Sequence, residues 1–209
     1  MMNNDVLLRA EQISRHYGDF IALQNVDLSV SRGEFVSVVG PNGAGKTTLV
    51  NVLTGLHQPT TGHVNFAGSN IAGVGAVDLA TRGLARAFQL TSIFPELTVR
   101  ETIAVSACSY LNMRWNSFGH LFGSRKVNEI VVRTADAFGL SPWLDTKGGS
   151  LPHGRRKLLD VASAFALHPK VMLLDEPTAG VSTADKHGVM ETLLRLSLIH
   201  ISEPTRQAE

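Results

Sequence analysis

The first third of the chain alternates apolar and polar residues in the manner of half-buried β-strands. This period of two recurs over residues 6–14, 22–30 and 63–66, so we expect three strands there. Residues 34–39 are mostly apolar and predict a buried strand, and residues 47–53 follow with helical spacing. The pattern predicts an antiparallel β-subdomain at the N-terminus, beside the start of an α/β core.

Helical spacing dominates the middle of the chain. A short helix over residues 77–83 and a strand over 84–88 lead into it, and helices are predicted over 98–107 and 126–140. Because strands and helices alternate on both sides of this stretch, we predict a helical subdomain, about residues 95–165, inserted into the α/β core.

One more helix and strand complete the pattern. Residues 158–167 predict a helix, and the apolar run 171–174 is typical of a central parallel strand buried on both faces. That strand ends in Asp175 and Glu176, two adjacent carboxylates that are costly to bury without cationic partners. The end of this strand is therefore a candidate metal site.

Composition excludes only a few classes of protein. The chain has 209 residues, of which 44% are hydrophobic and 18% charged, a balance typical of one large globular domain. A net charge of +1 gives no reason to expect nucleic acid as a partner. The single cysteine excludes an intramolecular disulfide. We find neither a signal peptide nor an apolar run of the roughly 18 residues that a membrane span needs.

The strongest motif lies between the predicted strand 34–39 and the helix 47–53. It fits the phosphate-binding pattern G-x-x-x-x-G-K-[ST], in which glycines let backbone N–H groups converge on phosphate oxygens. The lysine would reach the β- and γ-phosphates, and the threonine after it would ligate Mg²⁺. The residues of the motif are Gly40, Pro41, Asn42, Gly43, Ala44, Gly45, Lys46, Thr47 and Thr48.

Four other residues are candidates for roles at a nucleotide. Asp175 would hold Mg²⁺ through its water shell, and Glu176 would orient or deprotonate the attacking water. Gln89 ends a predicted strand and could present its amide to Mg²⁺ and that water. Tyr17 lies in a turn, where its ring is either a platform for adenine or a tyrosine that packs locally.

In their order, these motifs resemble the nucleotide-binding subunit of an ATP-binding cassette (ABC) transporter. The resemblance covers about residues 6–195. Within the family, the chain is most similar to the ATPases of branched-chain amino-acid importers. The residues that carry this similarity are 83–89 and 94–99. The residues and segments that carry the family resemblance are Tyr17, 40–48, Gln89, 150–155 and 171–180.

The resemblance implies the fold of a P-loop NTPase, with ATP and Mg²⁺ as cofactors. Two such subunits would clasp two ATP molecules, with Gly154 of one subunit covering the phosphates held by the other. Transmembrane permease subunits would dock near Gln89, and a periplasmic or extracellular solute-binding protein would act indirectly. The expected place of work is the cytoplasmic face of the plasma membrane.

The sequence departs from the family pattern in two places. Where the family has Leu-Ser-Gly-Gly-Gln, this chain has Leu151-Pro152-His153-Gly154-Arg155, which keeps the second glycine but lacks the serine hydroxyl. The family also has a further strand and a switch histidine toward the C-terminus, whereas residues 196–209 resemble translated sequencing adapter. We therefore expect a cassette over residues 1–195, incomplete at its C-terminus, a non-native tail over 196–209, and weak or no activity.

The alternatives to an importer ATPase are a soluble ABC-type ATPase and a P-loop kinase or GTPase. A soluble ABC-type ATPase that acts on nucleic acid or ribosomes usually carries tandem cassettes or coiled-coil insertions, and this chain shows neither. A P-loop GTPase needs a guanine-specifying Asn-Lys-x-Asp, which is also missing, and a kinase needs an acceptor-binding lid. The sequence does not encode the transported solute, because partner subunits choose it.

Overall fold

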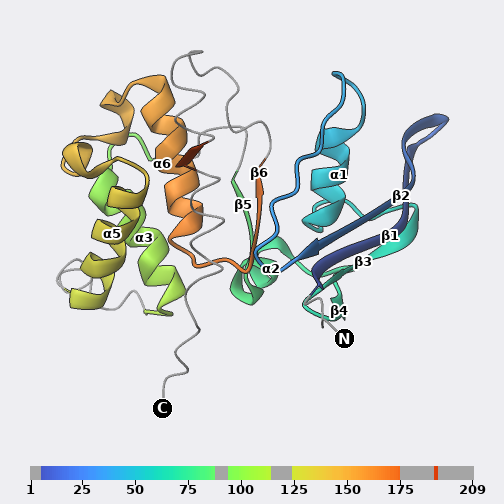
Figure 1. Cartoon of the computed structure of the whole chain (residues 1–209), viewed down its shortest axis with the longest axis horizontal. Helices are drawn as coiled ribbons and strands as arrows, with labels where there is room; N and C mark the ends of the chain where they lie inside the picture. Colours follow the sequence, from blue (N-terminus) through green and yellow to red (C-terminus); the bar gives the residue numbers. More distant parts are fainter. Residues whose placement is uncertain (1–5, 88–93, 114–123, 175–190, 193–209) are drawn as a thin grey trace. The chain divides into compact units, whose positions relative to one another are not determined.

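The computed structural model describes residues 6–87, 94–113, 124–174 and 191–192 (Figure 1). The chain divides into two compact units, one of residues 1–84 with 194–209 and the other of residues 85–193. Each unit is treated by itself below. The predictions for Gln89, Asp175, Glu176 and the tail 196–209 lie outside the described residues.

The N-terminal unit contains a four-stranded antiparallel sheet in the order β2-β1-β3-β4. A two-residue turn joins the two long strands, and Gly18 in this turn has φ +59°, a conformation that glycine adopts without strain. The strands are longer than the alternation predicts because both continue to the turn. They are β1 (Val6–Tyr17), β2 (Phe20–Ser31), β3 (Thr61–Phe66) and β4 (Ser69–Asn70).

One face of this sheet is apolar and buried. In the register of β1 with β3, Leu8 pairs with Phe66 and Ala10 with Val64, and all four side chains are at most 3% exposed. Residues two apart along a strand face the same side, so this pairing puts the four on one face. The predicted antiparallel arrangement of the N-terminal strands is therefore correct.

Helix α1 (Lys46–Leu53) packs against β2 with its buried residues Leu49, Val52 and Leu53. Helix α2 (Ala76–Arg82) ends at Gly83, whose φ of +100° allows the backbone to turn out of the helix. Both helices begin within one residue of the positions that the spacing predicts.

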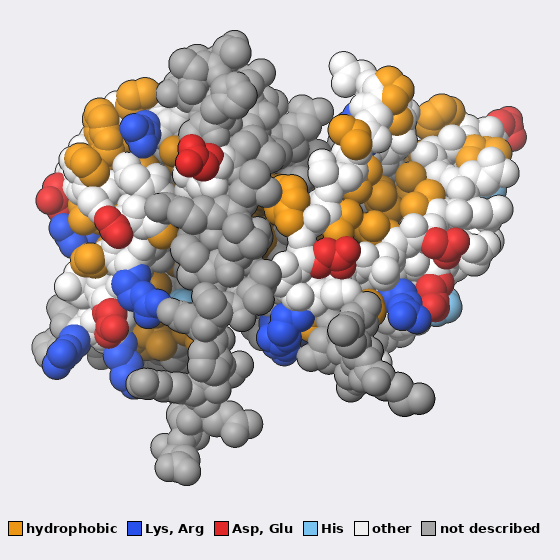
Figure 2. All heavy atoms as spheres, in the orientation of Figure 1, with side chains coloured by type: hydrophobic (Ala, Val, Ile, Leu, Met, Phe, Trp, Pro, Cys, Tyr) orange, Lys and Arg blue, Asp and Glu red, His pale blue; other side chains and the backbone are white. Residues whose placement is uncertain are grey.

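The predicted buried strand over residues 34–39 is wrong. These residues form no strand and are exposed; the exposed fraction is 44% for Phe35 and 90% for Val39. A core strand needs hydrogen-bonded neighbours, and in the described part of the chain β5 (Leu84–Ala87) and β6 (Val171–Leu174) pair only with each other. Figure 2 shows exposed apolar side chains on the N-terminal unit.

Strand β6 confirms the bounds of the predicted strand but not its full burial. Val171 is buried, whereas the three residues after it are half-buried. Two-sided burial requires cover on both faces along the whole strand, and among the described residues this cover is complete only at Val171.

The second unit is mainly helical. Helix α3 (Val99–Tyr110) contacts both α5 (Arg125–Ala137) and α6 (His153–Phe165), and short 3₁₀ turns lie at Ser141–Trp143 and Gly148–Ser150. The fully buried side chains that these helices contribute include Ile103, Ala107, Val131, Ala135, Leu159 and Ala162. None of the helices in the described ranges is long and apolar enough to cross a bilayer.

Two helix boundaries in this unit differ from the prediction. Helix α5 ends at Ala137, three residues early, because Gly139 at φ +64° turns the chain and the Leu140 N–H donates to the Ala135 carbonyl. Helix α6 begins at His153 rather than at residue 158, so its first turn contains Gly154 and the basic residues after it. Apolar spacing does not reveal a first turn that is mostly polar.

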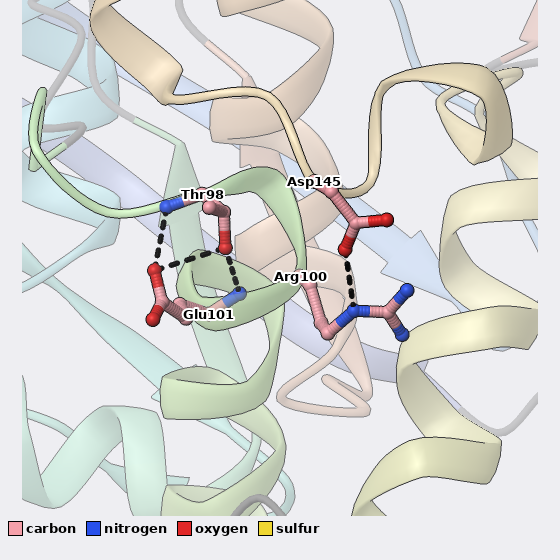
Figure 3. A network of polar contacts seen from close by, with 4 residues as sticks. All are labelled: Thr98, Arg100, Glu101 and Asp145. Carbon is pink, nitrogen blue, oxygen red and sulfur yellow. Dashed lines mark hydrogen bonds and ion pairs between the residues drawn. The ribbon is translucent and has the colours of Figure 1, made fainter.

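Helix α3 begins with a capping box (Figure 3). The Glu101 N–H donates to the Thr98 hydroxyl oxygen at 3.2 Å, and the Thr98 N–H donates to a carboxylate oxygen of Glu101 at 2.8 Å. Beside it, Nε of Arg100 donates to Asp145 at 3.1 Å. Two of the N–H groups that a helix start leaves without partners are satisfied by this box.

The segment that precedes α3 is joined to the segment that precedes α6. Four backbone hydrogen bonds connect residues 95–100 with residues 144–149, both of them described segments. Glu96 and Lys147 add an ion pair of 2.8 Å. The bonds run from Gly148 N–H to Leu97, from Gly149 N–H to Pro95, from Val99 N–H to Thr146 and from Arg100 N–H to Leu144.

Candidate nucleotide-binding site

Two glycines of the phosphate-binding motif have backbone conformations that other residues rarely adopt. Gly43 has φ +83° and Gly45 has φ +81°. A Cβ on Gly45 would lie 2.4 Å from the Ala22 carbonyl oxygen, whereas a Cβ on Gly43 would meet no atom within 4 Å. Gly45 is therefore required by contact with β2 as well as by its φ angle, and Gly43 by its φ angle alone.

Lys46 closes the loop. Its ammonium donates to the carbonyl oxygens of Gly40 at 2.8 Å and Pro41 at 2.7 Å, and the Ala44 N–H donates to Pro41 at 3.2 Å. The positive charge is thus held at the loop that precedes α1, and residues 40–44 are exposed. Lys46 itself is half-buried, and neutral carbonyl groups leave its positive charge uncompensated for an anion.

The residues present fit a phosphate chain. Helix α1 begins at Lys46 with Gly45 as its N-cap, and it has neither a side-chain cap nor an acidic residue in its first turn. Within the described residues the N–H groups of Lys46 and Thr47 have no backbone acceptor. These donors, the helix dipole and the ammonium together favour an anion. The exposed Thr47 hydroxyl and the half-buried Thr48 hydroxyl are the oxygen donors beside them.

Tyr17 ends β1, at the tip of the hairpin, and 41% of it is exposed. Its hydroxyl oxygen lies 2.8 Å from Nδ1 of His57, and the guanidinium carbon of Arg15 lies 4.6 Å from its ring centroid. The same hairpin reaches the phosphate-binding loop, because Leu23 pairs with Arg15 and also lies against Gly45. The hairpin that ends at Tyr17 is thus linked to the phosphate-binding loop through Leu23.

Gly154 lies in the first turn of α6 and is half-buried. Pro152 is the N-cap and makes no side-chain cap bond, and the first turn has no acidic residue. Arg155 donates to the Gly139 carbonyl at 3.2 Å, and Arg156 donates to the carbonyls of Gly149 at 2.9 Å and Leu151 at 3.2 Å. These two arginines fix the start of α6 to the backbone around it.

Farther along α6, burial raises the pKa of Asp160 to about 6, and Lys157 opposes that rise. Asp160 is half-buried, and its carboxylate is the only acidic group of α6. Burial therefore makes this carboxylate easier to protonate than an exposed one.

Sequence reasoning missed His57, which lies in the turn after α1. The only signal was a ring residue in a segment that otherwise has turn chemistry, and such histidines are usually solvated. Tyr17 and His57 are 40 positions apart in the chain, so periodicity could not predict their contact. The roles predicted for Gln89, Asp175 and Glu176 lie outside the described residues, and all the site assignments stay predictions.

Comparison with known proteins places the chain in a family. The family model described as "ABC transporter" matches residues 23–179, which is well over half of the chain. The high-affinity branched-chain amino acid transport ATP-binding protein BraF of Pseudomonas aeruginosa is 30% identical over 201 residues, 93% of this chain and 78% of that protein. The probable branched-chain amino acid transport ATP-binding protein LivG of Methanocaldococcus jannaschii is 33% identical over 91% of this chain and 75% of that protein.

Solved structures agree with these relatives. The structure of an ATP-binding cassette of an ABC transporter in its ADP conformation matches with a TM-score of 0.76 and 31% identity, over 93% of this chain and 78% of that one. The predicted α/β fold of a P-loop NTPase is therefore correct. The chain belongs to the ABC transporter family and is an ATP-binding subunit with ATPase activity.

Proposed function

We propose that this subunit powers the import of a small solute, namely branched-chain amino acids or a related compound. The support for this solute class is the similarity to BraF and LivG, whose names state branched-chain amino acid transport. We further propose that the subunit works peripherally at the cytoplasmic face of the plasma membrane and that a solute-binding protein delivers the solute to the permease. Residues 1–195 are assigned to the cassette, about 95–165 to its helical subdomain, and 196–209 to a tail outside it.

The observation that carries the ATPase assignment is the loop 40–48 together with the start of α1. This stretch contains the ammonium of Lys46 and two glycines at positive φ, Gly43 and Gly45. The first-turn N–H groups of α1 follow directly and have no side-chain cap. The triphosphate would take the N–H groups of this loop and draw Lys46 onto its β- and γ-phosphates. Asn42 would contribute its backbone N–H, the Ala44 N–H would exchange its bond to Pro41 for one to phosphate, and Tyr17 would receive the adenine.

The metal and the reacting water would be held by Thr47 of α1 and by residues that come after β5 and β6 in the sequence. Mg²⁺, when bound, offsets phosphate charge in the transition state. Thr47, Gln89 and Asp175 would hold it. Glu176 would take a proton from the attacking water, and Gln89 would help to orient that water.

A second ATP-binding subunit completes the site in this proposal. The start of α6 has no capping side chain, and Gly154 leaves its backbone accessible there. Across a head-to-tail dimer, these N–H groups of one subunit would reach the γ-phosphate that the other subunit holds. Pro152 supplies neither a hydroxyl nor an N–H, so backbone groups after it would do this work.

Transport by the assembled complex tests the proposal. The full-length form of the subunit, candidate permeases and a solute-binding protein are reconstituted in proteoliposomes, and uptake of radiolabelled leucine is compared with uptake of ribose. We expect ATP-dependent uptake of leucine, and its loss in the Glu176→Gln variant. That variant should still bind ATP, because the carboxylate acts on water rather than on the phosphates. Uptake of ribose alone would contradict the solute class, and wild-type turnover by Glu176→Gln would contradict its role.

A further inference from the structure

The hairpin tip and the turn after α1 form a small, well-connected cluster around Tyr17. The Tyr17 hydroxyl oxygen and Nδ1 of His57 share a hydrogen bond of 2.8 Å, in which the tautomer of His57 decides which group donates. The two rings meet edge to face, with 6.2 Å between centroids. The guanidinium of Arg15 lies over the Tyr17 ring at 4.6 Å. Tyr17 therefore has a partner at its hydroxyl and another on one face of its ring.

The turn that carries His57 is fixed to β1. Nη1 of Arg15 donates to the Gln58 carbonyl at 2.9 Å. The His16 N–H donates to the Thr60 hydroxyl oxygen at 3.0 Å, and the Thr60 N–H donates to the Ser14 carbonyl at 2.7 Å. These bonds surround the Tyr17–His57 contact, so His57 is held at a defined place beside the ring.

His57 is also attached to the helix of the phosphate-binding motif. Its backbone N–H donates to the carbonyl of Asn51 in α1 at 3.1 Å. Helix α1 therefore carries the phosphate-binding loop at its first turn and, through His57, the Tyr17 hydroxyl at its last turn. A helix is a rigid spacer, so the distance from the loop to the Tyr17 ring is set by α1 as well as by the hairpin.

We propose that His57 is a positioning residue for the base of the nucleotide. It holds the Tyr17 ring at a fixed distance from the phosphate-binding loop, and Arg15 covers one ring face, so that a planar base stacks on the other. This inference rests on the proposed role of Tyr17 as the adenine platform. An exposed fraction of 41% for Tyr17 leaves room for a base. A ring that is already ordered loses less entropy when the base stacks on it.

Two probes separate this role from a merely structural one: ATP and inorganic tripolyphosphate, which lacks the base. Their dissociation constants are measured by calorimetry with the full 209-residue chain. The variants are Tyr17→Phe, His57→Phe, their double mutant and His57→Asn. Phenylalanine keeps the ring shape without the hydrogen bond, whereas asparagine keeps a polar atom near the position of Nδ1. The midpoint of thermal unfolding is recorded for each variant.

We expect His57→Phe and Tyr17→Phe each to weaken ATP binding about 2- to 10-fold and to leave tripolyphosphate binding unchanged. The double mutant should be no weaker than either single mutant, because both remove the same bond. His57→Asn should recover most of the loss. Three results would overturn the proposal: ATP and tripolyphosphate binding weakened equally, losses that add up in the double mutant, or unchanged ATP binding in His57→Phe.

One further variant separates this proposal from the function on which it rests. Tyr17→Ala should reduce the preference for ATP over tripolyphosphate more than Tyr17→Phe does, because the stacking ring is gone. An unchanged preference would place the base elsewhere, and both the adenine platform and the role of His57 would fail. Tripolyphosphate has no base, so its binding to the same variant tests only the phosphate-binding loop. If this binding is unchanged, the loop assignment stands even where the adenine platform fails.

Discussion

Helices α1 and α3 begin in opposite ways. At α3, Thr98 and Glu101 satisfy each other's backbone N–H groups, and the helix start is complete within the chain. At α1, the N-cap is Gly45, which has no side chain to offer, and the first turn carries no acidic residue. The first-turn donors of α1 therefore remain for a ligand, while those of α3 are already used.

The difference shows how one element can be built for stability or for binding. A capping box stabilises a helix by about 1 kcal/mol and, by the same contacts, occupies the place where an anion would bind. A helix start without a capping side chain lacks that stabilisation, and its N–H groups stay available to an anion. Helix α6 resembles α1 in this respect, since Pro152 makes no side-chain cap bond and no acidic residue follows in the first turn.

The largest expected effect is at the open helix start. Replacing Lys46 with alanine removes the ammonium that now bonds to Gly40 and Pro41, and with it the charged ligand of the phosphates. We expect ATP affinity to fall about 1,000-fold, as two charge-assisted hydrogen bonds are lost. Calorimetric titration measures this affinity, with Lys126→Ala, which changes an exposed lysine of α5, as a control that keeps it. Unchanged affinity in Lys46→Ala would remove the contrast between α1 and α3.

The next effect compares two glycines of the same loop. Gly45→Ala should lower the free energy of unfolding by about 3 kcal/mol, because its methyl group would collide with the Ala22 carbonyl and its φ is positive. Gly43→Ala has a similar φ but open space, and should cost about 1 kcal/mol. Urea denaturation measures both. Equal losses would mean that contact with β2 does not constrain the loop.

At the closed helix start, Thr98→Ala removes the cap of α3. We expect a loss of about 1 kcal/mol in the free energy of unfolding, measured by urea denaturation. ATP affinity should stay at the wild-type value, because this helix start has no donors to give. Thr81→Ala is a matched control, since the Thr81 hydroxyl donates to the Asp78 carbonyl within α2 but caps no helix start. Weaker ATP binding in Thr98→Ala would contradict the division of roles.

The smallest effect is the pH dependence of the same cap. Hydrogen bonds from the Thr98 backbone N–H, and then from its hydroxyl, lower the pKa of Glu101 from its ordinary value of 4.5. A lowered pKa means that the carboxylate stabilises the fold above about pH 4.5 and that this stability is lost as the pH falls through the folded-state pKa. In Glu101→Gln, the urea midpoint should therefore fall less between about pH 6 and pH 3 than in the wild type. An identical acid slope would exclude Glu101 from the effect.

Local pattern predicted those elements whose stability is local. The strands around Tyr17, helix α1 and the loop between them follow from alternation, spacing and glycines at fixed positions. Residues 34–39 have an equally clear apolar pattern, yet they are exposed. Their burial depends on strand neighbours that no local pattern specifies, and the described sheets do not include them.

The candidate site was predictable in part for the same reason. The motif fixes the positions of Lys46 and Thr47, because one short segment of sequence forms both the loop and the helix start. His57 could not be predicted, since its contact with Tyr17 depends on how the turn after α1 is fixed to β1. The polar first turn of α6 was missed because apolar periodicity begins only at Leu158.

The four backbone hydrogen bonds between residues 95–100 and 144–149 have a mechanical consequence. Sliding one segment along the other would break all four together with the Glu96–Lys147 ion pair, whereas moving both as a body breaks none. A push on Pro95 or Leu97 is therefore delivered to Gly148 and Gly149, and from there through Arg156 to the start of α6. Any movement of residues 95–100 therefore involves the first turn of α6, where Gly154 lies.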